Sequence, residues 1–442
     1  MTKLNIKLVR IFDKIKEKDI RKVGQKEKNA FTRNRKLTFE DMMKCIICKK
    51  GKTTTMEINN YYKDIGRRSD AVTKQAFCKQ RLKLNPEVFI ELNRHLVRSV
   101  YDDPEYTLNK GYIVTAIDGT VLEIPNTEEL RDFYGYLNPN KENVRKMARA
   151  RVFGIYDIEN NIMIDSSIDK YKTPERKSAK LNIISALEIL GLERKIITIF
   201  DRGYFSTEML MFLLELPIKF LFRLQGNTFN KERKSMQSDD EIVEFKTNGA
   251  RASNISDKYL KGRASEVKQV PLRLVKIKLK TGEDEYLATN LPKDEFSTEE
   301  LNHLYSKRWG IETAYDVMKN KLCIENISGK KQIIVEQDFY AQMLLFNMVQ
   351  VLKNDANNEI NKKEKGTLKY HYKVNMNILI GTFKEYIIKI VIEEDDEKRE
   401  ELQSYMMEEI TKNLVPIRKG RSSPRKKYKG RNKYRVNVKQ NS

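Results

Sequence analysis

The stretch 195–205, KIITIFDRGYF, begins with an apolar, β-branched run and then turns at Asp201. Residues 112–120, YIVTAIDGT, follow the same pattern, with Asp118 directly after the apolar run. Short apolar runs bounded by turn residues predict buried strands. Taken singly, each aspartate is more often a turn or cap residue. Because side chains at the carboxyl ends of strands face the ligand in open α/β folds, we expect both at such an edge.

Strand and helix patterns alternate around these two runs. Turn residues at 159–161 separate the apolar segments 152–155 and 162–168 and predict an antiparallel hairpin. The further elements expected here are a helix over 174–191, a helix over 207–216 and a strand over 218–224. This order favours an α/β fold, a mixed sheet with helices packed on its faces.

The charge of the chain is unusual for a globular protein. Its 442 residues include 85 Lys and Arg against 62 Asp and Glu, a net charge of +23. Such a surplus repels itself unless it meets a polyanion; nucleic acid is the commonest partner, and a membrane surface is the weaker alternative. No apolar stretch reaches the roughly 18 residues of a membrane span, and residues 1–10 lack the apolar core of a secretory signal. We therefore expect a cytoplasmic location.

The N-terminal region combines basic charge with helical patterns. Residues 1–36 hold 13 basic and 4 acidic side chains, which suggests a solvated or DNA-facing arm. Helical patterns follow over 38–48, 70–82 and 86–100. We interpret these helices as a small DNA-binding domain. Lys74, Lys79, Arg81 and Lys83, on or beside the middle helix, are expected either to enter a DNA groove or to form a solvated basic face.

The chain is longer than one hydrophobic core usually allows, so we expect several domains. Polar turns and alternating segments after residue 225 indicate a mainly β insertion, and Ser297 with Glu300 has capping-box spacing for the next helix. The expected division is a helical N-terminal DNA-binding domain with its basic arm at 1–105, a core at 106–225 and 297–355, a β-rich insertion at 226–296, a C-terminal helical region at 356–417, and a basic disordered tail at 418–442.

Four cysteines are too few and too scattered for a disulfide framework. Cys45 and Cys48 have the spacing of half a zinc site, but neither a second pair nor a nearby His-x-x-x-His follows. We interpret both as core thiols on a helix rather than as metal ligands.

Tyr305, Arg308, Glu312 and Lys319 form a periodic set. At about 100° per residue on an α-helix they fall within roughly 60° of arc and make one polar stripe. An apolar stripe lies beside it, formed by Leu304, Ile311, Tyr315, Met318 and Leu322. We expect this helix to bury the apolar stripe against the sheet and to hold the polar stripe at the margin, with a kink tolerated at Gly310.

Three acids, Asp118, Asp201 and Glu312, would suit phosphoryl transfer. Phosphodiester cleavage needs an activated water or 3′-hydroxyl and compensation for charge on the leaving oxygen. Two hard cations about 4 Å apart supply both, and carboxylate oxygens are the ligands that Mg²⁺ prefers. Two carboxylates that close repel by about 4 kcal/mol at an effective dielectric constant of about 20, so their convergence implies bound metal or raised pKa values.

These motifs together resemble the DDE transposases of bacterial insertion sequences, specifically the insertion-sequence-4 family with its Tyr-Arg-Glu-Lys signature. The spacing of Tyr305, Arg308, Glu312 and Lys319 matches that signature, and the run YSKRWGIE at 305–312 looks like the family's third catalytic region. Asp118-Gly-Thr and Asp201-Arg-Gly-Tyr resemble the first two regions. The resemblance covers roughly residues 70–350.

The resemblance implies a ribonuclease-H-like core with a β-rich insertion, in which Asp118, Asp201 and Glu312 hold two Mg²⁺ or Mn²⁺ ions. It also implies a homodimer acting on paired transposon ends in double-stranded DNA, with excision followed by strand transfer. By the same carry-over, the residues expected to contact DNA are Tyr305, Arg308, Lys319, Arg202 and Trp309. Some relatives hold a flipped base during hairpin formation. Because residues 226–296 contain no Trp, the stacking aromatic for that step is unassigned.

Two other functions compete with an active transposase. One is a ribonuclease-H-like nuclease without strand transfer, which the basic ends of the chain and the full signature disfavour. The other is a non-catalytic DNA-binding protein descended from a transposase, which the three intact acids disfavour.

Overall fold

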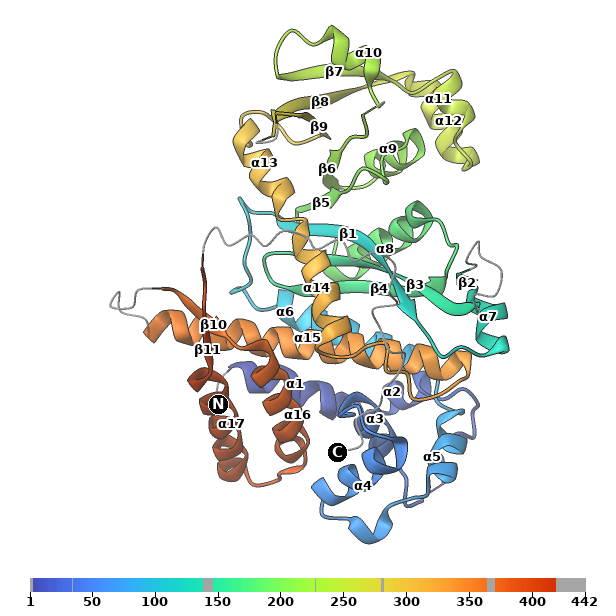
Figure 1. The fold of residues 1–442 in the computed structure, drawn as a ribbon, viewed down its shortest axis with the longest axis vertical. Coiled ribbons are helices and arrows are strands. Elements are labelled where there is room, and N and C mark those ends of the chain that lie inside the picture. Colours follow the sequence, from blue (N-terminus) through green and yellow to red (C-terminus); the bar gives the residue numbers. More distant parts are fainter. Residues whose placement is uncertain are drawn as a thin grey trace. The chain divides into compact units, whose positions relative to one another are not determined.

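The computed structural model describes residues 3–33, 35–137, 146–226, 228–279, 282–363 and 370–418 (Figure 1). The basic tail predicted at 418–442 lies outside these residues except for Arg418. The chain divides into two compact units. In their described parts, the helical unit comprises Met1–Asp103, Val121–Ala150 and Asp316–Ser442, and the sheet unit comprises Pro104–Thr120 and Arg151–Tyr315.

A mixed sheet organises the middle of the sequence. Its strand order is β2-β3-β1-β5-β6-β9-β8-β7, and β4 pairs with β3. The strands are β1 (Ile113–Glu123), β2 (Tyr136–Leu137), β3 (Met147–Asp157), β4 (Ile162–Lys170), β5 (Ile196–Phe200), β6 (Ile218–Arg223), β7 (Asp240–Lys246), β8 (Gln269–Lys278) and β9 (Asp284–Thr289). Neighbours β1, β5 and β6 are parallel, whereas β6, β9, β8 and β7 pair antiparallel. The predicted α/β class, mixed sheet and β3–β4 hairpin are confirmed.

The parallel strands are buried because their sequences are almost continuously apolar. Every residue of β5 and the first five of β1 are buried. The polar exceptions, Thr115 and Thr198, face each other with their hydroxyl oxygens 3.0 Å apart, and Thr115 also donates to the carbonyl oxygen of Ile197. Each buried hydroxyl therefore has a partner, and the sheet core holds no unsatisfied threonine.

Helices of the sheet unit connect and cover these strands (Figure 1). They are α8 (Glu175–Leu190), α9 (Thr207–Leu214), α10 (Asn230–Ser235), α11 (Ala250–Ser253), α12 (Lys258–Val267), α13 (Thr298–Ser306) and the start of α14 (Trp309–Asn320). Helix α8 packs on β4, and α9 packs on β6. The capping box predicted for Ser297 and Glu300 is present at the start of α13.

The segment 226–296 differs from the mainly β insertion that alternation predicted. It contains three helices, α10, α11 and α12, besides β7, β8 and β9 in its described residues. Its strands continue the central sheet: β9 pairs with β6, and Thr289 on β9 donates to the carbonyl oxygen of Phe220 at 2.5 Å. Alternation along a strand indicates one buried face but does not say which edge the strand joins, so the sequence missed this continuity.

The helical unit is built around one long helix, α15 (Gln332–Lys363). It packs against α1, α3, α6, α7, α16 and α17. The other elements of the unit are α1 (Lys3–Lys14), α2 (Lys18–Val23), α3 (Phe39–Ile47), α4 (Thr54–Asp64), η1 (Arg68–Asp70), α5 (Lys74–Arg81), α6 (Glu87–Tyr101), α7 (Glu128–Tyr134), β10 (Tyr372–Val374), α16 (Met376–Ile392), α17 (Asp396–Lys412) and β11 (Leu414–Pro416). The predicted N-terminal helices correspond to α3, α5 and α6.

The first residues differ from the solvated arm that their charge suggested. Leu8, Ile11, Phe12 and Ile15 on and after α1 are all buried, at the spacing of one helix face. Helix α1 packs against α6 and α15. Net charge concealed this amphipathic pattern, in which Arg10 and Asp13 are exposed while the apolar side chains are buried.

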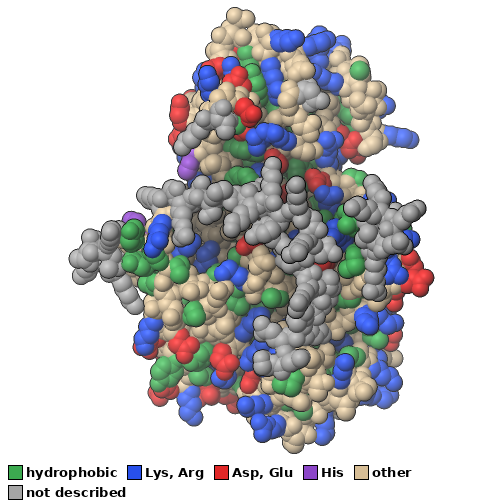
Figure 2. All heavy atoms as spheres, viewed as in Figure 1, with side chains coloured by type: hydrophobic (Ala, Val, Ile, Leu, Met, Phe, Trp, Pro, Cys, Tyr) green, Lys and Arg blue, Asp and Glu red, His purple; other side chains and the backbone are tan. Residues whose placement is uncertain are grey.

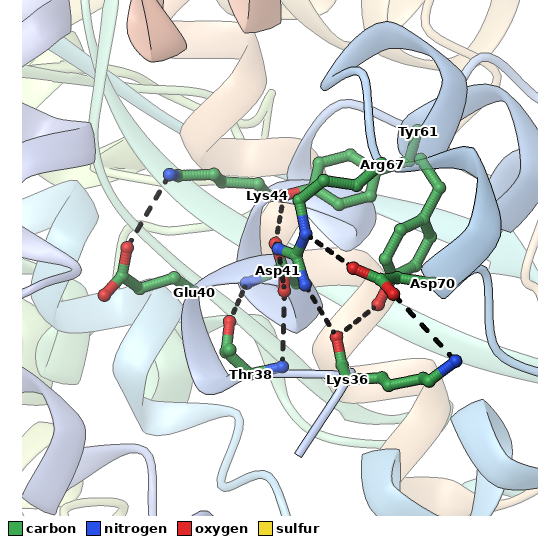
Figure 3. Close-up of polar contacts among 9 residues, drawn as sticks. Lys36, Thr38, Glu40, Asp41, Lys44, Tyr61, Arg67 and Asp70 are labelled. Carbon is green, nitrogen blue, oxygen red and sulfur yellow. Dashed lines mark hydrogen bonds and ion pairs between the residues drawn. The ribbon is translucent and has the colours of Figure 1, made fainter. Parts of the chain in front are cut away.

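A buried aspartate joins the helices before α5 (Figure 3). Asp41 on α3 forms a capping box with Thr38 and accepts a hydrogen bond from the hydroxyl of Tyr61 at 2.8 Å. Arg67 donates to Asp41 at 3.2 Å and, through Nε, to Asp70 at 3.1 Å. Asp41 therefore links the start of α3 to Tyr61 on α4 and to Arg67 in the segment that leads to α5.

A second buried network holds the end of α5. Arg81 donates to Gln337 at 2.7 Å and to the fully buried carboxylate of Asp338 at 2.8 Å, and Lys49 contacts that carboxylate at 2.8 Å. Burial alone would raise the pKa of Asp338, but Arg81, Lys49 and Ser328 hold it well below its ordinary range. The charge of Arg81 is thus committed to the fold rather than to a partner molecule.

The structure bears on two alternatives raised by the sequence, a zinc site at the cysteines and a membrane surface as partner. Cys45 and Cys48 are buried in the core around α3, as interpreted from the sequence, and burial raises the pKa of Cys48 to about 12. Among the described residues, no helix is both long and apolar enough to cross a membrane. Lys and Arg side chains are spread over the face of each unit shown in Figure 2.

Asp338→Asn should lower the free energy of unfolding by about 3–5 kcal/mol, because it leaves Arg81 and Lys49 buried against a neutral group. The comparison is urea unfolding at pH 7 against Glu129→Gln, an exposed acid on α7 whose loss should stay within about 0.5 kcal/mol. Because the folded-state pKa is depressed, the stabilisation is present above the unfolded pKa of about 3.9 and is lost as pH falls through the folded value. Equal stabilities of the two variants would contradict this role.

Candidate active site

The two aspartates lie on or directly after neighbouring parallel strands. In the parallel ladder of β1 and β5, Ala116 lies opposite Ile199. Two residues further along each chain come Asp118, still on β1, and Asp201, the residue directly after β5; neighbouring strands in a sheet lie about 4.8 Å apart. The two apolar runs therefore lie side by side as parallel strands.

One detail of β1 differs from the prediction. The strand does not end at Asp118 but runs through it to Glu123. Gly119 permits this course, because a Cβ at this position would lie 2.8 Å from the ring of Phe153 on β3. The sequence Asp-Gly-Thr resembles a turn, and only the closeness of β3 explains why glycine stands inside a strand here.

The third acid comes from a helix pair rather than from one continuous helix. Helix α13 ends at Ser306 and α14 begins at Trp309. The link is tightened by bonds over three residues, from Arg308 N to Tyr305 O at 3.0 Å and from Ile311 N to Arg308 O at 3.2 Å. The sequence allowed a kink at Gly310. The structure instead has a break between two helices, just before this glycine. A Cβ on Gly310 would approach Ile158 to 3.3 Å.

Despite the break, the predicted polar residues meet the aspartates. The Tyr305 hydroxyl donates to Asp201 Oδ1 at 3.1 Å. Arg308 donates to Glu312 Oε1 at 2.9 Å and its other terminal nitrogen lies 3.9 Å from Asp118 Oδ2. The structure therefore brings together five of the residues singled out from the sequence.

Burial and charge act together on these groups. Burial raises the pKa of Asp118 to about 6; Glu312 and Glu175 add to the rise, while Arg308 and the Gly119 N–H oppose it. Arg308 is only 4% exposed, and burial disfavours its charge, but the neighbouring acids raise its pKa overall. In this structure the guanidinium compensates the acids, and no group of three or more acid, His or Cys side chains among the described residues is arranged to hold a metal ion.

Comparison with known proteins identifies the family. Residues 109–348, more than half of the chain, match the family described as Transposase DDE domain. The chain belongs to this family. It is a DNA transposase, an enzyme that acts on DNA, and DDE transposases depend on divalent metal ions, which fits Mg²⁺.

Among solved structures, the transposase is similar to the piggyBac transposase in its synaptic complex with hairpin DNA, with a TM-score of 0.45 and 13% identity over 91% of this chain and 85% of that chain. No curated protein matches the chain.

Three other residues predicted to contact DNA have separate surroundings. Lys319 lies in the helical unit, where it donates to the carbonyl oxygen of Val121 at 2.7 Å, and burial lowers its pKa. Arg202, in the turn after Asp201, is exposed, with Nη2 3.9 Å from Glu285. Trp309 is 49% exposed, and the guanidinium of Arg308 lies 5.2 Å from its ring centre.

Tyr315 contacts the backbone of Asp118, a role that was not predicted from the sequence. Tyr315 was assigned to the apolar stripe, yet its hydroxyl donates to the backbone oxygen of Asp118 at 2.9 Å. The available signal was its residue type, because a buried tyrosine usually needs a partner for its hydroxyl. The transposase thus holds Asp118 both through its carboxylate and through its backbone.

Gly119→Ala should cost about 1–3 kcal/mol of stability by overpacking against Phe153. It should also displace Asp118 and lower DNA cleavage by up to about 100-fold. The matched control is Gly262→Ala on α12, where an added methyl group meets open space and should be neutral or stabilising. Unfolding and cleavage are measured for both variants; a Gly119 variant as stable and active as the Gly262 variant would show that Phe153 yields freely.

Proposed function

We propose that this transposase moves an insertion sequence by a cut-and-paste route, with Asp118, Asp201 and Glu312 as its metal-binding acids. The observation that carries the proposal is their arrangement. Asp118 lies on β1, Asp201 directly follows the parallel neighbour β5, and Arg308 links Glu312 to Asp118. This arrangement is the one expected if a shared substrate phosphate is to be held between strand ends and a helix.

The donor set suits two Mg²⁺ or Mn²⁺ ions. Carboxylate oxygens are the hard ligands that both ions accept, and burial together with neighbouring acids already disfavours negative charge on Asp118. Arg308 has an unpaired buried Nε atom within the described residues, so its guanidinium is not saturated by the protein. When bound, the ions would activate the attacking water or 3′-hydroxyl and offset charge on the leaving oxygen.

The chain's own side chains would position the DNA. Tyr305 orients Asp201, and Arg308 is placed to hold the scissile phosphate by charge-assisted hydrogen bonds. Lys319, Arg202 and Trp309 are proposed to contact DNA beyond that phosphate. The spacing of Tyr305, Arg308, Glu312 and Lys319 supports membership of the insertion-sequence-4 group.

The central five strands support a ribonuclease-H-like core. They have the order β4-β3-β1-β5-β6, with β5 and β6 parallel to β1 and reached through α8 and α9. We propose that residues 106–225 and 297–355 form this core around the insertion at 226–296, with 356–417 as the C-terminal helical region. The tail after residue 418 is proposed to bind phosphate.

The helical N-terminal region is proposed to bind transposon ends. On α5, Lys74 and Lys79 are exposed, while Phe77 and Arg81 are buried. Arg67, in the segment before this helix, pairs with Asp41, and Arg81 at the end of the helix pairs with Asp338. A rigid helix with a basic outer face fits a DNA groove better than an unanchored arm does. We propose that a homodimer pairs the two ends in the cytoplasm and joins them to target DNA.

Substitutions of the three acids test the catalytic proposal. Asp118→Ala, Asp201→Ala and Glu312→Ala should each lower Mg²⁺-dependent cleavage by more than about 100-fold, since even the outer partners of metal ligands are worth about 10–100-fold. The substrate is a duplex carrying the inverted repeats that flank the gene, and gel-shift binding without metal should persist.

Asp294→Ala, an exposed acid in the sheet unit, is the control and should cut normally. Normal cutting by all three site variants would reject the assignment. Cleavage without a joined product in a target plasmid would favour the nuclease alternative.

Lys74→Ala with Lys79→Ala should weaken binding to an end duplex and flatten its dependence on salt. Each lost phosphate contact reduces the magnitude of the slope of log K against log salt by about 0.9. Lys398→Ala, which removes one positive charge at an exposed position on α17, serves as the control. A fluorescence-anisotropy series between about 50 and 200 mM salt measures the slopes; an unchanged slope in the double variant would remove α5 from the DNA interface.

A further inference from the structure

A fourth carboxylate lies beside the candidate acids. Glu175 is the first residue of α8, and its Oε2 would lie 3.6 Å from a Cβ built on Gly203. Arg176, the next residue, donates to the carbonyl oxygen of Gly203 at 3.0 Å. The start of α8 is therefore held against the turn that follows Asp201.

Tyr204, the last residue of that turn, is buried. The N–H of Tyr204 donates to the carbonyl oxygen of Asp201 at 3.1 Å, which closes the turn and sends the ring back toward Phe200, 5.9 Å between ring centres. The side chain is almost wholly buried, at 1% exposure. Burial raises the pKa of Tyr204 well above its ordinary range, and the charges of Asp118 and Glu175 raise it further.

The hydroxyl of Tyr204 has no hydrogen-bond partner among the described residues. Buried hydroxyl groups are nearly always satisfied by protein, water or ligand, and an exception needs an explanation. Simple packing does not supply one, because phenylalanine would fill the same space without the unsatisfied oxygen. A water or ion held among the carboxylates would supply the missing partner.

Glu175 resembles the other site acids in how its charge is compensated. Arg151 on β3 pairs with Glu175, and its guanidinium lies 5.5 Å from the ring centre of Phe153. Arg308 relates to Asp118 and Glu312 in the same way. An acid in the first turn of a helix is also favoured by the helix dipole. The dipole accounts for Glu175 but leaves the buried hydroxyl of Tyr204 unexplained.

We propose that Glu175 is a fourth carboxylate of the divalent-cation site, and that Tyr204 is a positioning residue whose hydroxyl binds a water or ligand oxygen between Glu175 and Asp118. This inference rests on the proposed metal site. It extends that site to the start of α8, an element that the sequence motifs do not include.

The test is Mn²⁺ binding to the full chain without DNA, followed by calorimetry and by the EPR signal of free Mn²⁺. Glu175→Gln should weaken binding by about tenfold, the lower range for partners of metal ligands. Glu188→Gln, an exposed acid on the same helix, should bind as the wild type does. Glu175→Asp, which keeps the charge, should recover part of the loss.

Tyr204→Phe separates a positioning role from a structural one. Because the hydroxyl has no protein partner, the variant should unfold at the same temperature as the wild type or higher, yet bind Mn²⁺ several-fold more weakly. Lower thermal stability with unchanged Mn²⁺ affinity would overturn the inference.

Asp118→Ala distinguishes this inference from the proposed function. If Asp118→Ala binds Mn²⁺ as the wild type does, the proposed metal site itself fails, and the inference fails with it. If Asp118→Ala loses binding while Glu175→Gln and Tyr204→Phe keep it, only the fourth carboxylate is rejected. Loss in all three variants supports both.

Discussion

Arg308 contacts Glu312 and Asp118 from a buried position, and the remainder of the site is arranged around this compensation of charge. Without a nearby cation, acids this close together would repel one another, and burial would drive them toward their neutral forms. The raised pKa of Asp118 shows that the compensation is incomplete. On the proposed function, divalent ions and a substrate phosphate would complete this compensation of charge.

Backbone geometry makes that assembly possible. The parallel pairing of β1 and β5 places Asp118 on one strand and Asp201 directly after its neighbour, and the break between α13 and α14 lets Tyr305 and Arg308 reach different acids. Tyr315 holds the backbone of Asp118 from the same helix as Glu312. The position of β1 is therefore linked to the position of α14 through this hydrogen bond.

The helical unit follows a different principle, in which buried charge is used for architecture. Asp41 and Asp338 each bind arginine inside the fold, and α5 lies between these two networks. Arg81, which its sequence neighbours would group with a DNA-binding face, is consumed by Asp338. The exposed lysines of α5 remain for a polyanion, which agrees with the net charge of +23.

The sequence by itself determined the α/β class, the β3–β4 hairpin, the strand before Asp201 and the capped start of α13, because these depend on local apolar runs, turns and caps. It also determined which acids to consider, since their spacing relative to strands and helix is local. Only contacts in the tertiary structure decide that β1 continues past Asp118, that 226–296 extends the central sheet, and that residues 3–14 and 18–23 fold as helices. The burial of Tyr204 and the partners of Tyr315 and Arg81 likewise follow only from the tertiary structure. These outcomes depend on contacts between residues far apart in the chain, such as Gly119 with Phe153, and periodicity along one segment carries no information about them.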